Sequence, residues 1–440
     1  MTIASADGTA LAATLHLPSA APPAGGWPGI VVMHGLSQTR STADSIATAA
    51  GFIGEEYAVL SVDARGHGAS GGLITVDGPN EIADVRAVFE WLRGRPDVSD
   101  TRVGAWGISY GGGAALLSLA AGVPWAAVEA AQTWSELGAA LLPQGLAKSG
   151  VAGLFFAGLP PARIDPSVVR IRDSAFAGTN LAEVSRWTAQ RSSLGALRGN
   201  RTPIFLMQGR RDFAFGLDQA KRLYGLLAGP KRLWIGNHGH APSTFPAADT
   251  PRMLAEGKRW FDRFLRGVPN GIERTRPVTV AAEGTAATRT FARVPVGRAN
   301  AATQTFARTR IIGAQGRIVA ETGRTRSASE IVGAPLVRVE ATARRGWSRL
   351  VAVLTARTPA GKEIVVSGGG VPTVPGTKVY KIKLIDQATA VPAGSRLTVT
   401  LGASSLAQNP ANLLYLNLPM PPGARLAVRE IGLVYSTMTR

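Results

Sequence analysis

The sequence predicts an α/β domain with an inserted helical segment, followed by an all-β domain. Short apolar runs at residues 29–33 and 58–63 alternate with helical stretches, a pattern typical of strands buried on both faces of a parallel sheet. Beyond about residue 275, β-rich runs punctuated by Gly and Pro recur without a long amphipathic helix, as in a β-sandwich or jelly roll. The predicted divisions are 1–133 and 201–272 for the two parts of the α/β core, 134–200 for the insertion and 273–440 for the β-sandwich.

Composition narrows the classes of function. At 440 residues with 45% hydrophobic content, the chain is long enough for a large core and more than one domain. The absence of cysteine excludes disulfides, thiolate catalysis and cysteine-ligated zinc. The net charge of +19 comes from basic residues that are scattered singly and are not interleaved with aromatic residues. We therefore expect a solvated basic surface and no nucleic-acid partner.

Neither a leader nor a membrane span is evident. Residues 1–8 show no basic segment followed by an apolar one, so no signal peptide is visible. Residues 103–128 carry no charge and are long enough to cross a bilayer, but the glycines at 107, 111–113 and 122 and Pro124 interrupt them. We expect strand, turn, helix and strand here, and no membrane insertion. The compartment, cytoplasmic or secreted, and the oligomeric state are left open by the sequence.

The most informative motif is G-x-S-x-G at residues 107–111. An apolar strand that starts at Val103 leads into it, and an Ala/Leu-rich helix over 114–121 follows. A serine on such a tight strand-to-helix turn has its hydroxyl exposed, which makes Ser109 the candidate nucleophile. A Gly-rich turn with an incidental serine is the alternative. The strand before the motif, the helix after it and the catalytic partners described below favour the nucleophile.

Residues after the earlier strands belong at the same edge of the sheet. His34, Gly35 and Leu36 follow the strand at 29–33, and the backbone N–H of Leu36, joined by that of Tyr110, would face a developing oxyanion. We interpret His34 and His67 as loop residues that do not act as acid or base. Residues 80–93 have apolar side chains at helical spacing and predict an amphipathic helix packed on the sheet.

The insertion at 134–200 contains several short helical stretches, with apolar groups and few carboxylates. We expect it to be a lid that decides which substrates fit and excludes water from the nucleophile. Aromatic residues of this lid and of the loop after the strand at 203–209 are the candidate lining of the substrate pocket. They are Trp134, Phe155, Phe156, Phe213 and Phe215.

The remaining two catalytic candidates follow the last strands of the core. Asp212 comes just after the strand at 203–209, where the acid of a hydrolase triad lies. The alternative is that Asp212 is the N-cap of the helix predicted at 216–227. The strand at 231–235 is followed by two histidines, His238 and His240. The tight turn around His240 can present its imidazole to the cleft, so we favour His240 as the base. The order Ser, Asp, His is then complete.

These features resemble the X-Pro dipeptidyl-peptidase and cocaine-esterase-like family of serine hydrolases. The resemblance covers nearly the whole chain and is most specific at residues 107–112, 81–84, 90–92 and 391–399. It implies an α/β-hydrolase fold with a helical lid and a C-terminal jelly-roll domain, and acyl transfer to a serine. It also implies Ser109 as nucleophile, Asp212 as acid and His240 as base.

The chain departs from that pattern at one position. Cocaine-esterase-like members place an Arg-Thr-Pro-Tyr segment after the early strand, and its tyrosine hydroxyl helps to form the oxyanion hole. Residues 34–37 of this chain read His-Gly-Leu-Ser. We therefore expect a backbone donor from Leu36 and do not carry over the substrate preference of those esterases.

The sequence thus predicts a serine hydrolase that needs neither metal nor cofactor and acts on small-molecule carboxylic esters. One alternative is a peptidase that releases X-Pro dipeptides, which would need acidic groups to hold a substrate ammonium. The acid-poor lid disfavours that alternative. A second is a catalytically silent protein that binds carbohydrate or polymer through its β domain, which the complete Ser, Asp, His order disfavours. The acyl and alcohol groups of the substrate are not determined by the sequence.

Overall fold

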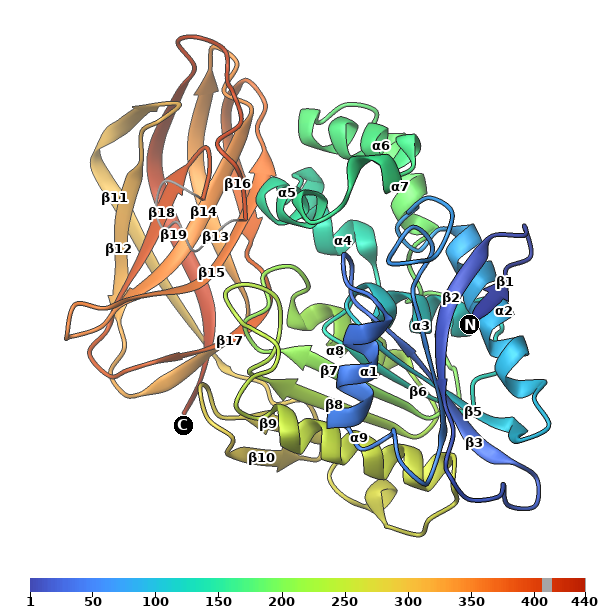
Figure 1. The fold of residues 1–440 in the computed structure, drawn as a ribbon. Helices are drawn as coiled ribbons and strands as arrows, with labels where there is room; N and C mark the ends of the chain where they lie inside the picture. The colour runs from blue at the N-terminus through green and yellow to red at the C-terminus, as the bar shows by residue number, and fades with distance from the viewer. Residues whose placement is uncertain (406–413, 440) are drawn as a thin grey trace.

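A ten-stranded sheet forms the centre of the first domain in the computed structural model, which describes residues 1–405 and 414–439 (Figure 1). Its order is β1-β2-β4-β3-β5-β6-β7-β8-β9-β10. The strands from β4 to β9 along this order are parallel, whereas β1, β2 and β10 pair antiparallel at the two edges. The bounds are β1 Thr2–Ala4, β2 Ala10–His16, β3 Trp27–Met33, β4 Ala58–Val62, β5 Val98–Ile108, β6 Ala127–Ala131, β7 Ile204–Gly209, β8 Lys231–Gly236, β9 Val278–Ala281 and β10 Thr288–Phe291.

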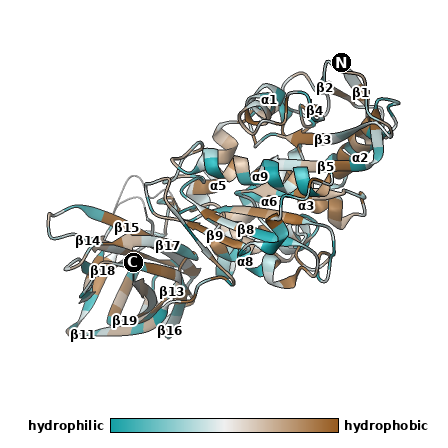
Figure 2. Ribbon diagram, turned by 90° about the horizontal axis from the view of Figure 1, so that it is seen from below, coloured by the Kyte–Doolittle hydropathy of each residue, from teal (hydrophilic) through white to brown (hydrophobic). Residues whose placement is uncertain are grey.

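Helices cover both faces of this sheet, as the buried apolar strands require. Helices α1 (Arg40–Ala49) and α9 (Thr250–Phe264) pack on one face, and their buried residues share a cluster with Trp106 and Phe205. Helices α2 (Pro79–Arg93), α3 (Tyr110–Ala120) and α8 (Leu217–Leu226) pack on the other face. The parallel strands β3 and β5 are largely hydrophobic in Figure 2. Because the central strands are parallel, their carboxyl ends lie at the same edge of the sheet. The loops that carry the candidate residues follow these ends.

The predicted insertion occupies the connection between β6 and β7. It consists of α4 (Leu137–Leu141), α5 (Ser149–Ala157), α6 (Pro166–Ala177) and α7 (Leu181–Ala189), with two short 3-10 turns at Pro143–Gly145 and Pro161–Arg163. In Figure 1 these helices, in green, form a separate group beside the β-rich domain. They bring Phe155 of α5 against His240, with ring centroids 5.5 Å apart.

Two antiparallel sheets form the second domain. One has the order β11-β19-β13-β16, with β17 also paired to β13, and the other has the order β12-β18-β14-β15. Their inner faces enclose a separate apolar core. The bounds are β11 Arg298–Gly313, β12 Ile318–Arg324, β13 Ser329–Arg344, β14 Arg349–Arg357, β15 Glu363–Pro372, β16 Gly376–Lys383, β17 Gln387–Val391, β18 Arg396–Gly402 and β19 Arg425–Thr439.

The structure differs from the sequence prediction near the start of this domain. The sequence assigns the β-rich run at 278–282 to the sandwich, whereas β9 pairs with β8 in the first sheet and β10 pairs with β9. The residues of a short run such as Val278–Ala281 do not indicate which strand it will pair with. The pairing is decided by the exposed edge of β8, whose hydrogen-bonding groups β9 satisfies.

Arg210 joins the two domains. It is 1% exposed, its Nε donates to the Ala388 carbonyl oxygen at 3.0 Å, and its guanidinium also donates to the Ala281 carbonyl oxygen. It forms an ion pair with Glu330 of the sandwich at 2.9 Å. Because Glu330 is also buried, removal of Arg210 would leave a carboxylate with reduced charge compensation away from water.

We therefore expect Arg210→Met to lower the free energy of unfolding by about 3–5 kcal/mol, the usual effect of breaking a buried ion pair. Urea denaturation followed by tryptophan fluorescence measures this. Arg396→Met is the control, because Arg396 and Glu321 form an exposed pair at 3.3 Å whose loss costs about 1 kcal/mol or less. Equal losses in the two variants would contradict a special role for Arg210.

Candidate active site

Ser109 lies on the turn between β5 and α3 in a backbone conformation that L residues rarely adopt, with φ +54° and ψ −112°. Close packing imposes this turn. A Cβ on Gly107 would lie 2.1 Å from the Gly111 carbonyl oxygen, and one on Gly111 would lie 2.3 Å from the Met33 carbonyl oxygen. The small residues of the motif are therefore required for strand and helix to approach each other, and the turn presents the Ser109 hydroxyl at the end of the sheet.

Ser109, His240 and Asp212 form one hydrogen-bonded row. The Ser109 Oγ lies 2.9 Å from His240 Nε2, and His240 Nδ1 lies 2.8 Å from Asp212 Oδ2. The same carboxylate oxygen accepts a hydrogen bond from the His240 backbone N–H at 3.0 Å. The structure thus brings together all three residues that the sequence selected, and the imidazole bridges a hydroxyl and a buried carboxylate.

Asp212 is fully buried, and its other oxygen accepts hydrogen bonds from the Ala214 and Phe215 amides at 2.9 Å each. Burial acts to raise the pKa of this carboxyl, but the charge and hydrogen bonds of His240, together with the Phe215 amide, outweigh it and hold the pKa below its usual value. The carboxylate stays ionised and favours the imidazole tautomer with hydrogen on Nδ1, which leaves Nε2 to accept from Ser109. Helix α8 has Gly216 at its N-cap, so Asp212 does not cap it.

The His238 side chain is not part of this hydrogen-bonded row. Its side chain is fully buried, and the ring of Phe245 packs against it edge to face with the centroids 6.5 Å apart. Burial lowers the pKa of His238, which keeps its imidazole neutral. Of the two histidines that follow β8, His240 is therefore the one that contacts the Ser109 hydroxyl.

The backbone amides of Leu36 and Tyr110 form the candidate oxyanion hole. Within residues 1–405 and 414–439, neither amide donates a hydrogen bond to another group of the chain. The Leu36 loop is fixed on both sides: the Gly35 N–H donates to Gln38 Oε1 at 2.9 Å, and the Gly111 N–H donates to the His34 carbonyl at 3.0 Å. Both amides are thus free to bind a developing negative oxygen.

His34 supports that loop, as the sequence predicted for a loop-packing residue. Its Nδ1–H donates to the Gly35 carbonyl at 2.7 Å, and its Nε2 accepts from the Ala64 N–H at 3.0 Å. This pair of contacts requires the neutral imidazole, and burial lowers the pKa of His34 to about 4. The role of Gln38 had no signal in the sequence, because a lone polar residue in a loop does not reveal which amide it accepts from.

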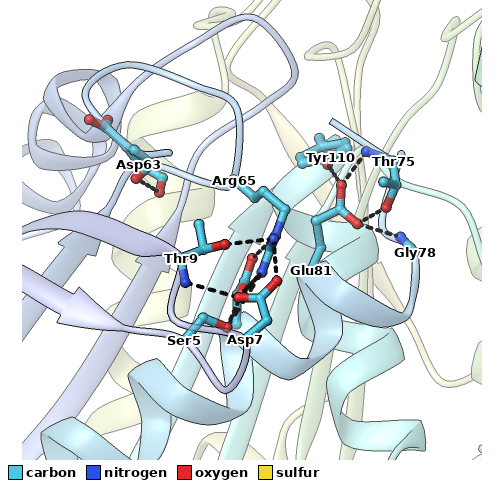
Figure 3. Close-up of polar contacts among 11 residues, drawn as sticks. Ser5, Asp7, Thr9, Asp63, Arg65, Thr75, Gly78, Glu81 and Tyr110 are labelled. Carbon is cyan, nitrogen blue, oxygen red and sulfur yellow. Dashed lines mark hydrogen bonds and ion pairs between the residues drawn. The ribbon is translucent and has the colours of Figure 1, made fainter. Parts of the chain in front are cut away.

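Behind the nucleophile, a buried carboxylate anchors Tyr110. The Tyr110 hydroxyl donates to Glu81 Oε1 at 3.1 Å (Figure 3). The Gly78 N–H donates to Glu81 Oε2 at 2.9 Å, and both the backbone N–H and the hydroxyl of Thr75 donate to Glu81 as well. Glu81 thus fixes the first residue of α3 to the loop that precedes α2.

A buried ion pair between Arg65 and Asp84 connects the loop after β4 to α2. Arg65 forms two hydrogen bonds with Asp84, at 2.8 Å from Nε and 2.6 Å from Nη2. It also donates to Asp7 from Nη1 at 2.7 Å (Figure 3). Residues 81–84, which contributed to the family resemblance, therefore hold the scaffold of the site. They do not face the Ser109 hydroxyl in the contacts of the described residues.

Ser109 and His240 open onto a cleft of about 540 Å³. Its described lining contains no Asp, Glu, Lys or Arg, so the walls carry no fixed charge. The lining residues are Gly35, Leu36, Ser37, Gln38, Thr42, Ser45, Ile46, Ala49, Ile108, Ser109, Gln132, Leu154, Phe155, His240, Phe245, Pro246, Thr250 and Leu254.

The aromatic residues proposed for the pocket separate into three groups. Phe155 lines the cleft. Phe156 lines a neighbouring apolar pocket of about 110 Å³ between the lid helices. Trp134, Phe213 and Phe215 are instead buried in a cluster that reaches Val351 and Val365 of the sandwich, so these three predictions are corrected. Their large apolar surfaces bind the domains together, although the Phe215 ring still packs against His240 at 5.1 Å.

The described part of the chain has neither a cluster of metal-binding side chains nor a helix that could span a membrane. No group of three or more His, Cys, Asp or Glu residues there is arranged to hold a metal ion. None of the helices described is both long enough and apolar enough to cross a membrane.

A parallel sheet with a serine on its strand-to-helix turn, a helical insertion and a separate β-sandwich define an α/β hydrolase with an accessory domain. Comparison with known proteins agrees with this class. Residues 7–154 match the family model described as X-Pro dipeptidyl-peptidase (S15 family). The predicted resemblance to this family is confirmed by the match, which covers about a third of the chain.

Individual relatives are distant. A putative Xaa-Pro dipeptidyl-peptidase from Streptomyces avermitilis is 26% identical over 256 residues, which cover 51% of this chain and 36% of the relative, so the chain spans little more than a third of that protein. A CocE/NonD family hydrolase from Staphylococcus aureus superposes with a TM-score of 0.72 at 13% identity, over 100% of this chain and 93% of its own. An alpha-amino acid ester hydrolase gives a TM-score of 0.68 at 15% identity, over 100% and 96%. The structural likeness confirms the predicted fold.

The pKa of His34 predicts how acid affects the protein. An unfolded histidine takes up a proton near pH 6.5, whereas folded His34 does so near pH 4. Between these values the unfolded state binds more protons, so the stability that neutral His34 provides is present above pH 6.5 and lost as the pH falls toward 4, by up to about 3 kcal/mol.

We expect urea denaturation between pH 7 and pH 4 to show a shallower loss of stability in His34→Gln than in the wild type. The two other buried histidines are unchanged in both proteins, so the difference reports on His34. Parallel pH curves for the two proteins would contradict this assignment.

Proposed function

We propose that this chain is an esterase that cleaves uncharged carboxylic esters through an acyl-enzyme on Ser109. The observation that carries the proposal is the Ser109, His240, Asp212 row opening onto a cleft without fixed charge. A hydroxyl 2.9 Å from an imidazole that is itself oriented by an ionised carboxylate is the arrangement that activates a serine.

The reaction would proceed in two halves. His240 Nε2 removes the Ser109 proton as Oγ attacks the carbonyl carbon, and the Leu36 and Tyr110 amides bind the oxyanion of the tetrahedral intermediate. The imidazolium then protonates the departing alcohol, leaving the acyl-serine. Water, deprotonated by His240, attacks that ester and releases the acid. Asp212 keeps the imidazole in the required tautomer and stabilises its positive charge.

The cleft favours esters over peptides that begin with a free amine. A peptidase that releases X-Pro dipeptides must hold a substrate ammonium, and removal of that charge from water is unfavourable without a carboxylate partner. The described lining contains no such carboxylate. Relatives bear the names of a peptidase and of an ester hydrolase, so these names do not decide between the two activities.

The first test compares substrates. We expect the wild type to hydrolyse short p-nitrophenyl esters at a kcat/KM at least about 100-fold above that for X-Pro p-nitroanilides, since an unpaired buried ammonium costs several kcal/mol. Dominant turnover of the anilides would contradict an esterase. A fluorophosphonate probe should label the wild type and not Ser109→Ala, and absence of labelling in the folded wild type would contradict serine catalysis itself.

The second test separates the two histidines. We expect His240→Ala to lower kcat by about 10⁴-fold or more, as loss of a triad base does. His238→Ala removes a buried ring that does not contact Ser109, so kcat per folded molecule should change by less than about tenfold. Circular dichroism measures the folded fraction of each variant. A larger loss in His238→Ala than in His240→Ala would reverse the assignment of the base.

A further inference from the structure

Gln132 occupies a position beside the nucleophile that the mechanism above does not use. It follows the last residue of β6, and its neighbours on both sides bind the Ser109 backbone: the Ser109 N–H donates to the Ala131 carbonyl at 2.8 Å, and Thr133 Oγ1 donates to the Ser109 carbonyl at 2.7 Å. Gln132 therefore lies next to Ser109, and it lines the same cleft as Ser109 and His240.

The backbone at Gln132 is strained, with φ +40°, a value that L side chains rarely adopt. Its N–H donates to the Met207 carbonyl of β7 at 2.6 Å, which fixes this conformation between the two strands. Strained residues persist where the surrounding structure holds them, and they are concentrated at functional sites. The strain alone does not define a ligand, but it fixes where the side chain begins.

The side-chain amide of Gln132 has no hydrogen-bond partner among the residues that the structure describes. The residue is 5% exposed, and its Oε1 is buried without a hydrogen bond to any residue that the structure describes. Buried polar atoms are nearly always paired, because an unpaired one loses its contacts with water and gains nothing in return. Because Gln132 belongs to the lining of the cleft, its unpaired amide is a candidate for a hydrogen bond with a ligand bound there.

Three other polar side chains of the cleft, those of Gln38, Ser45 and Thr250, are already engaged in hydrogen bonds. Gln38 Oε1 accepts from the Gly35 N–H, the Ser45 hydroxyl donates to the Ser41 carbonyl at 2.9 Å, and Thr250 Oγ1 accepts from the Ala247 N–H at 2.8 Å. Gln132 differs from these three, since its acceptor is unused. It combines an acceptor with two donors, so a hydroxyl group, which both donates and accepts, matches either orientation of the amide.

We propose that Gln132 is a substrate-binding residue that hydrogen-bonds a hydroxyl group close to the scissile ester, so that the preferred substrates are uncharged hydroxylated esters. The proposal rests on the esterase function proposed above and adds the chemical class of its substrate. The neutral amide and the uncharged walls of the cleft fit a neutral polar group better than an ammonium or a carboxylate, which would need a counter-charge.

The experiment uses two matched pairs of esters, because the hydroxyl can lie on either side of the bond. On the acyl side, p-nitrophenyl 3-hydroxybutyrate is compared with p-nitrophenyl butyrate. On the alcohol side, glyceryl monobutyrate is compared with propyl butyrate by titration of the released acid. In at least one pair, we expect the wild type to prefer the hydroxylated ester by about tenfold in kcat/KM, the worth of one good hydrogen bond in a closed site.

Gln132→Met keeps the length of the side chain and removes its hydrogen-bonding groups. We expect kcat/KM for the hydroxylated ester of the preferred pair to fall about tenfold, mainly through KM, while the plain ester changes less than about twofold. The matched control is Gln304→Met on β11, where another glutamine has an Oε1 without a partner among the described residues, in the β-sandwich. That variant should leave both values unchanged.

The outcomes separate the two proposals. Equal loss on both members of the pair in Gln132→Met, with fluorophosphonate labelling intact, would overturn the role of Gln132 and leave the esterase standing. No preference of the wild type for either hydroxylated ester would also overturn it, and this measurement needs no variant to fold. An unlabelled wild type without ester turnover would instead overturn the esterase, and the substrate class with it.

Discussion

The strand β5 and the helix α3 can approach each other closely at Ser109 because residues 107 and 111 have no side chains. That approach holds Ser109 at φ +54° and aims the start of α3 at the cleft, where the Tyr110 N–H is free to donate. The same contact brings the Gly111 N–H to the His34 carbonyl at 3.0 Å, so the early loop with Leu36 is fixed against the nucleophile turn. Both halves of the candidate oxyanion hole thus depend on one close contact between backbones.

The loop that follows β7 and carries Asp212 is held by contacts with the α/β core, the lid and the β-sandwich. Lys148 of the lid is buried, and its Nζ donates to the Phe213 and Ala214 carbonyls at 3.0 and 2.9 Å. Arg211, next to the acid, donates to the Val365 carbonyl of the sandwich at 2.8 Å. Asp212 is therefore oriented by the core, by the lid and by the β-sandwich together. This arrangement gives the second domain a structural part in the site without requiring it to contact substrate.

Some residues of the site could be predicted and others could not. Ser109, Asp212 and His240 each follow a recognisable strand in a local pattern, so their convergence at one sheet edge follows from the parallel order of the strands. Trp134 and Phe213 were predicted to line the pocket for the same reason as Phe155, because they are aromatic residues of the lid or of the loop after β7. In the structure they are buried in the cluster that reaches the sandwich, whereas Phe155 lines the cleft. Gln132 had no signal, because an unpaired amide is recognised only from what surrounds it.

The sequence by itself determined the fold class, the nucleophile turn and the order of the catalytic candidates, since these follow from periodicity and from glycines that a tight turn needs. Tertiary structure decided what depends on contacts between distant segments. It chose His240 over His238, paired β9 with the first sheet, and left the cleft walls without charge. A local pattern predicts whether a segment is a helix, a strand or a turn. Packing decides which distant side chains meet, such as Asp212 and His240, 28 residues apart, or Ser109 and His240, 131 residues apart.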